Sequence, residues 1–228
     1  MNSFFKNNWW KLLGLTLILY SIVAGFLIEV PKLQGNIGES IRNLFFHVVM
    51  WFAMMVMFGN SLVRSLRYLS TFDIKHDLVA YESVNIGLLF GMLGIVTGME
   101  WANFTWGTPW TNDPQLNGAA VTILAYFAYL VLRRSIDEDN KRARIAAVYN
   151  VFAFVMLIVF IGILPKMASG SLHPGAGGSS STVSSLDPTM RLVFYPAIAG
   201  WIIIGYWLIN LKVRMANIRQ MLDNPEQS

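Results

Sequence analysis

His47 and His173 are the residues of this chain best suited to bind a metal-containing ligand. The sequence contains 3 histidines, and these two lie far apart, in the segments IRNLFFHV and SLHPG. Neutral imidazole is a common axial ligand of haem iron, and one imidazole on each face of a porphyrin completes the coordination. No cluster of further ligands for zinc accompanies either residue. The alternative for each is a hydrogen-bonded histidine at the membrane interface. We expect His76, the third histidine, to be a solvated connector residue.

A tryptophan-rich segment, WANFTWGTPWTND at residues 101–113, lies between two long apolar runs. Tryptophan is common at the membrane–water interface, where its amphipathic ring suits the headgroup layer. Three indoles within ten residues, at Trp101, Trp106 and Trp110, exceed what anchoring requires. Their faces would also provide apolar contact for a planar macrocycle. The segment is therefore either an anchor or one wall of a ligand site.

Two charged residues lie beside these candidates. Asp113 precedes Pro114, a pattern that predicts a helix N-cap followed by proline in the first turn. The N-terminus of such a helix favours nearby anions, and haem carries two propionates. Arg42, five residues before His47, could pair with a propionate. The alternative for Arg42 is an arginine that snorkels to the interface or is neutral with respect to topology.

Composition indicates that these residues are positioned by membrane-spanning helices. Only 13% of the 228 residues are charged, against about 25% in soluble domains, and 55% are hydrophobic. The apolar runs are continuous, as in helices, and do not alternate as in barrel strands. We expect one polytopic, all-α membrane domain over residues 1–228, a bundle of six transmembrane helices whose first span is retained. The predicted spans are 10–30, 44–64, 79–99, 115–132, 145–164 and 191–211.

Positive charge predicts the orientation of the bundle. Thirteen of the 17 basic residues lie at the termini or after the second and fourth runs, and the others are Lys32, Arg42, Lys166 and Arg191. The positive-inside rule then places both termini in the cytoplasm. Segments 31–43, 100–114 and 165–190 would face outward, the last a histidine-bearing loop whose Gly and Ser content is typical of flexible chain. We expect a multi-pass protein of the bacterial inner membrane with a periplasmic functional face.

The chain lacks the sequence features that several functional classes of protein require. The chain has no cysteine, which excludes disulfides, iron–sulfur clusters and covalent haem attachment through cysteine. It has no Gly-rich nucleotide loop and no catalytic constellation, so we do not expect an enzyme. The net charge of +4 reflects membrane topology, and we expect no nucleic-acid partner. These exclusions favour a role in binding or transport.

The tryptophan segment resembles a known signature. WGTPWTND at residues 106–113 is similar to the WGxxWxWD pattern of haem-handling proteins of cytochrome c biogenesis, and the six spans and histidine segments most resemble the CcmC family. The resemblance implies axial ligation of haem b by His47 and His173. It also implies a haem-binding segment formed by Trp106, Gly107, Trp110 and Asp113. Asn112 departs from the pattern, which has tryptophan there.

The same resemblance implies a function and partners. Members of the family present haem at the outer face to the haem chaperone CcmE, together with the transporter subunits CcmA and CcmB and the small subunit CcmD. Two alternatives stay open. A b-type membrane cytochrome would exchange electrons with quinone, although two outward histidines allow one bis-histidine haem at most. A haem-free permease subunit would use its tryptophans only as anchors.

Overall fold

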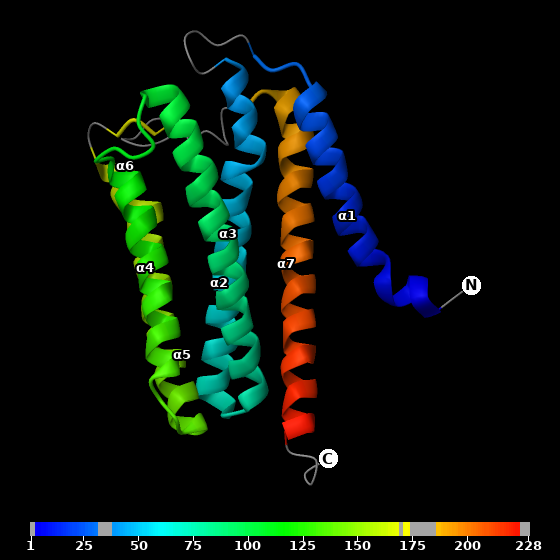
Figure 1. Cartoon of the computed structure of the whole chain (residues 1–228), viewed down its shortest axis with the longest axis vertical. Coiled ribbons are helices and arrows are strands. Elements are labelled where there is room, and N and C mark those ends of the chain that lie inside the picture. The colour runs from blue at the N-terminus through cyan, green and yellow to red at the C-terminus, as the bar shows by residue number, and fades with distance from the viewer. Residues whose placement is uncertain (1–2, 32–37, 169–170, 174–185, 224–228) are drawn as a thin grey trace.

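The computed structural model describes residues 3–31, 38–168, 171–173 and 186–223, and this part of the chain is helical with short connections (Figure 1). Within these residues six helices are long and apolar enough to span a membrane, which confirms the predicted all-α class with six candidate spans. The elements are α1 (Ser3–Leu27), η2 (Glu39–Phe45), α2 (His47–Thr71), α3 (Ile74–Trp106), α4 (Pro114–Arg134), α5 (Asp139–Leu157), η3 (Ile158–Ile163), α6 (Leu164–Met167) and α7 (Pro188–Asp223).

Two predicted spans are interrupted near one end of the bundle. The second apolar run begins as the 3₁₀ helix η2, and α2 starts anew at His47. The fifth run widens into the π-helix η3 just before Pro165, whose ring nitrogen has no hydrogen to donate to the preceding turn. Both irregular segments lie at the end of the bundle that also carries the α3–α4 loop (Figure 1). We call this the site end.

Helix α2 occupies the middle of the bundle. It packs most extensively against α3 and also contacts α5, α7 and η2, whereas α1 contacts only α7 and η2. Fully buried side chains on α2 include Val49, Ala53, Met54, Met57 and Phe58. Helix α1 diverges from the other helices toward its N-terminus and leaves most of its apolar surface exposed (Figure 1). The bundle is therefore organised around α2, with α1 attached at its margin.

A glycine face on α3 allows α2 to approach closely. Its members lie four, three and four residues apart, which places them on one side of the helix: Gly87, Gly91, Gly94 and Gly98. A Cβ atom at Gly87 would lie 2.5 Å from the ring of Phe58, closer than real contacts allow. Phe58 in turn stacks on Tyr126 of α4, with ring centroids 3.5 Å apart. The absence of side chains on α3 thus admits large aromatic rings from α2.

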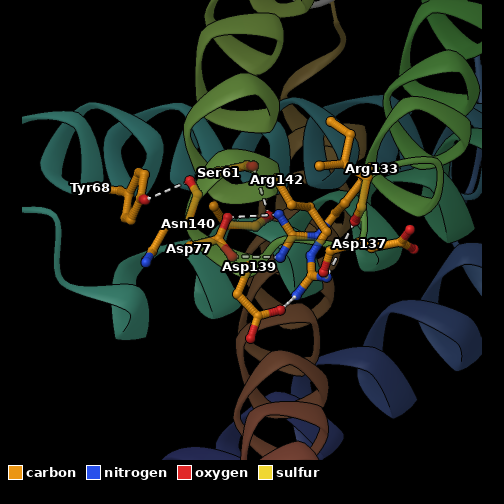
Figure 2. A network of polar contacts seen from close by, with 10 residues as sticks. Ser61, Tyr68, Asp77, Arg133, Asp137, Asp139, Asn140 and Arg142 are labelled. Atoms are coloured by element: carbon orange, nitrogen blue, oxygen red, sulfur yellow. Dashed lines mark hydrogen bonds and ion pairs between the residues drawn. The ribbon is translucent and has the colours of Figure 1, made fainter.

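The opposite end of the bundle contains a buried ion pair (Figure 2). Arg133 of α4 donates two hydrogen bonds to the carboxylate of Asp77 of α3, at 2.7 and 2.5 Å. The guanidinium also lies over the ring of Tyr81, 4.8 Å from its centroid. A second carboxylate of α3, Glu82, is buried and lies 3.7 Å from the ammonium of Lys212. The sequence alone does not distinguish these two acidic residues, and the structure places a cation within ion-pair distance of each.

We predict that Arg133→Ala destabilises the protein far more than Arg142→Ala. Removing Arg133 leaves the carboxylate of Asp77 buried without its partner, a change that typically costs about 3–5 kcal/mol. Arg142 pairs with Asp139 near the α4–α5 turn, where 75% of the Asp139 side chain is exposed (Figure 2). Its loss should cost about 0–1 kcal/mol. Thermal unfolding of the detergent-solubilised variants measures both, and equal effects would contradict a structural role for the buried pair.

Candidate functional site

The site end contains a cavity of about 630 Å³ between the helices. This volume lies within the range of about 300–1,000 Å³ that is usual for ligand pockets. Its walls come from η2, α2, α3, the first turns of α4, and the segment η3–α6, and most of the lining side chains are apolar. His47 and His173 both line it. The fold therefore brings two histidines that are 126 residues apart in sequence onto one cavity.

His47, the first residue of α2, is held against the backbone of α3. Its Nδ1 lies 2.8 Å from the carbonyl oxygen of Gly94. A carbonyl oxygen only accepts, so Nδ1 donates, and the lone pair of the neutral ring is on Nε2. Gly98 provides the space, since a Cβ atom there would lie 2.5 Å from Cε1 of the imidazole. Trp51, one turn further along α2, packs edge-on against the ring. The imidazole is thus fixed in position and tautomer.

Asp113 holds His173, the second histidine of the cavity, through hydrogen bonds. Its carboxylate caps α4 by accepting from the backbone N–H of Gln115, at 2.8 Å, which confirms the predicted N-cap. The same carboxylate accepts from the hydroxyl of Ser171 and the N–H of Leu172, at 2.8 and 2.7 Å. It also lies 3.2 Å from Nδ1 of His173, which donates to it. This pattern again leaves the lone pair of the imidazole on Nε2.

The charges of this pair follow from burial and hydrogen bonding. Burial opposes ionisation of Asp113, but the hydrogen bonds from Leu172, Ser171 and Gln115 outweigh it and hold the pKa of the carboxyl below its usual value. Burial lowers the pKa of His173 below its usual value, and the adjacent carboxylate offsets only part of this effect. At neutral pH the pair is therefore an ionised Asp113 beside a neutral imidazole, the form that binds metal ions.

The three tryptophans have different positions. Trp101 and Trp110 line the cavity. Trp106 packs edge-on against both Trp101 and the ring of His173, with centroids 5.4 and 5.1 Å apart. Helix α3 continues through Trp106 and ends at Gly107, whose positive φ of 77° suits glycine, so only residues 107–113 form the connecting loop. Trp106 therefore supports the position of His173, while the other two rings form the wall.

Arg42 has a structural role that the sequence did not indicate. Its Nη1 donates to the carbonyl oxygens of Gly25 and Ile28 at the C-terminal end of α1, at 2.9 and 2.8 Å, and its Nε binds Glu39. A cation at this end of a helix stabilises the exposed carbonyl groups. The side chain is not among the described residues that line the cavity. Arg42 thus fastens α1 to η2, and its contact with a ligand stays a prediction.

Several residues that sequence analysis passed over belong to this site. Gly98 leaves the niche for His47 and Gly94 accepts its hydrogen bond, while Ser171 anchors the segment that carries His173. Lys166 and Gln115 contribute polar groups to the cavity wall. Asn112 is exposed, accepts a hydrogen bond from Asn117, and lies outside the wall. The glycine spacing on α3 was visible in the sequence, whereas the charge pattern placed Lys166 in an outward segment without showing that it lines a cavity.

Comparison with known proteins identifies relatives along nearly the whole chain. The family described as CcmC, Heme exporter protein C, matches residues 3–227. Heme exporter protein C of Bradyrhizobium diazoefficiens is 30% identical over 67% of this chain and 59% of its own length. The protein of that name from Haemophilus influenzae is 24% identical over 92% of this chain and 85% of its own.

A second group of relatives matches a shorter region. Cytochrome c biogenesis protein CcsA of Prochlorococcus marinus is 33% identical over 105 residues, which is 46% of this chain and 32% of that protein. The chain therefore spans about a third of the length of such relatives. The near full-length match favours the resemblance drawn from the histidine and tryptophan segments. The chain belongs to the CcmC, Heme exporter protein C, family.

Proposed function

We propose that this protein binds haem b as cargo in the cavity of the site end and delivers it for cytochrome c biogenesis. The observation that carries the proposal is the pair of histidines on one cavity, each with Nδ1 hydrogen-bonded and Nε2 left as donor to a metal. Two such nitrogens suit axial ligation of haem iron. The apolar wall and the rings of Trp101 and Trp110 suit the macrocycle.

The two proposed ligands are held in different ways. His47 is part of α2 and packs against α3, so its position is as rigid as the helices. His173 follows α6 on a short segment whose hydrogen bonds to Asp113 hold it at the cavity. We infer that release of the cargo begins with movement of the His173 segment, while His47 retains the iron. Unequal ligands of this kind suit a protein that must transfer haem.

Family membership and charge distribution suggest where delivery takes place. The positive-inside rule places the site end at the periplasmic face of the bacterial inner membrane. The proposed recipient there is the haem chaperone CcmE. The proposed assembly partners are CcmA, CcmB and the small subunit CcmD, and membrane lipid surrounds the spans. The role is binding and transfer, without a catalytic step by this chain.

We predict that His47→Ala combined with His173→Ala removes haem from the purified protein. Without both imidazoles, neither face of the macrocycle has a strong iron ligand. Each single variant should retain less haem, with a spectrum of altered coordination. His76→Ala is the matched control, because His76 lies at the opposite end, near Arg64. Absorption spectra of the oxidised and reduced proteins measure the effect. Unchanged haem content in the double variant would refute the ligand assignment.

We predict that Gly98→Ala also lowers haem content, although it alters no proposed ligand. The added methyl group would lie 2.5 Å from Cε1 of His47, so the imidazole must move from its position. Alanine favours helix over glycine by about 1 kcal/mol, so helix propensity is not the cause of any loss. Gly59→Ala on α2 is the control, since its methyl group would meet only Phe154, at 3.8 Å. Equal haem content in both variants would show that the niche is not required.

We predict that Asp113→Asn accelerates haem transfer to the chaperone. Asparagine is as good an N-cap as aspartate, so α4 retains its cap. Its amide cannot accept both hydrogen bonds from Ser171 and Leu172 while it also holds His173, so that segment is released more easily. Stopped-flow transfer to CcmE measures the rate.

The wild-type protein also tests the alternative function. If quinol reduces its bound haem and the haem is never transferred to CcmE, the protein is a b-type cytochrome.

A further inference from the structure

The wall of the cavity carries one charged side chain among the described residues, and that residue is Lys166. It lies in α6, the single helical turn that follows the π-helix η3. Gly162, Pro165 and Lys166 all line the cavity, so the turn that follows the π-helix brings a lysine to the wall of the site. The rest of the described wall consists of apolar residues with a few neutral polar groups. Such a site suits a ligand with a large apolar body and one anionic edge.

The other cations of the outward segments are bound by groups of the protein or lie outside the described residues. The Arg42 guanidinium is bound by the carbonyl oxygens of Gly25 in α1 and Ile28 just after it, and by Glu39. Arg191 donates through Nε to the carbonyl oxygen of Leu186, and Lys32 lies outside the described residues. Within the described part of the chain, no carboxylate forms an ion pair with the ammonium of Lys166. Its charge is thus available to a ligand.

We propose that Lys166 binds a propionate carboxylate of haem and so makes the site selective for porphyrins with free carboxylates. This inference rests on the function proposed above and replaces Arg42 as the first partner of a propionate. Burying an anionic edge against an apolar wall is costly unless a cation or water compensates the charge. Lys166 is an exposed residue that also lines the cavity, a position suited to an anionic edge that stays in contact with water. His173, seven residues later, takes the iron at the centre of the same ring.

Binding of two porphyrins to the full-length protein tests this assignment. Ferric haem and its dimethyl ester are titrated against wild type, Lys166→Gln and Lys166→Arg in lipid nanodiscs. Absorption changes report the affinity. The ester keeps the iron and the macrocycle but lacks the carboxylate charges. We expect Lys166→Gln to bind haem about three- to tenfold more weakly and the ester as wild type does. Lys166→Arg retains the charge and should bind haem within about twofold of wild type.

Two controls separate this inference from other causes. Lys75→Gln removes an exposed lysine from the first turn of α3 at the opposite end, and should leave both affinities unchanged. The haem affinity of wild type should also fall with added salt more steeply than that of Lys166→Gln, because an exposed ion pair is screened.

The outcomes distinguish the two proposals. If Lys166→Gln weakens the binding of haem and of the ester equally, or weakens the binding of neither, Lys166 does not recognise a propionate. The proposal that the protein binds haem is unaffected by that result. Equal weakening would indicate that Lys166 only maintains the shape of α6. If wild type binds neither porphyrin, the proposed function fails as well. If wild type binds both but the double variant His47→Ala, His173→Ala binds them equally well, the iron ligands are wrong.

Discussion

The close contact between α2 and α3 is the constraint on which the remainder of the structure depends. Glycines at four positions leave one face of α3 without side chains, so rings from α2 pack directly against its backbone. Phe58 uses this space in the core, and His47 uses it at the site end. Because α2 also contacts α5 and α7, its position determines where the other helices lie. The packing that stabilises the bundle therefore also fixes one of the two proposed ligands.

A second constraint acts through one carboxylate. Asp113 ends the tryptophan loop, caps α4 and binds the segment from Ser171 to His173, so it joins two connections that are far apart in sequence. A carboxylate has enough acceptor positions for all of these donors. One histidine of the cavity is thus held by helix packing and the other by hydrogen bonds to a single residue.

The polar groups of the protein are distributed unequally between its ends. At the opposite end, Asp77 and Glu82 are buried in α3 and lie within ion-pair distance of Arg133 and Lys212, as expected for charges held in an apolar environment. At the site end, the two imidazoles keep Nε2 as an acceptor, and Lys166 brings a cation to the cavity wall. The charges of the first set are paired with one another and support the fold. The second set is suited to a ligand.

Much of this architecture was predictable because membrane helices are encoded locally. Continuous apolar runs determined six spans, and Asp113-Pro114 determined where α4 begins. The two candidate histidines could also be recognised in the sequence, since few polar residues lie next to the apolar runs. The sequence could not show that Arg42 caps α1, that Trp106 supports His173, or that Lys166 lines the cavity. The first two findings are contacts between segments 14 to 67 residues apart in sequence, and the third depends on the path of the chain after the π-helix. Only tertiary packing decides these positions.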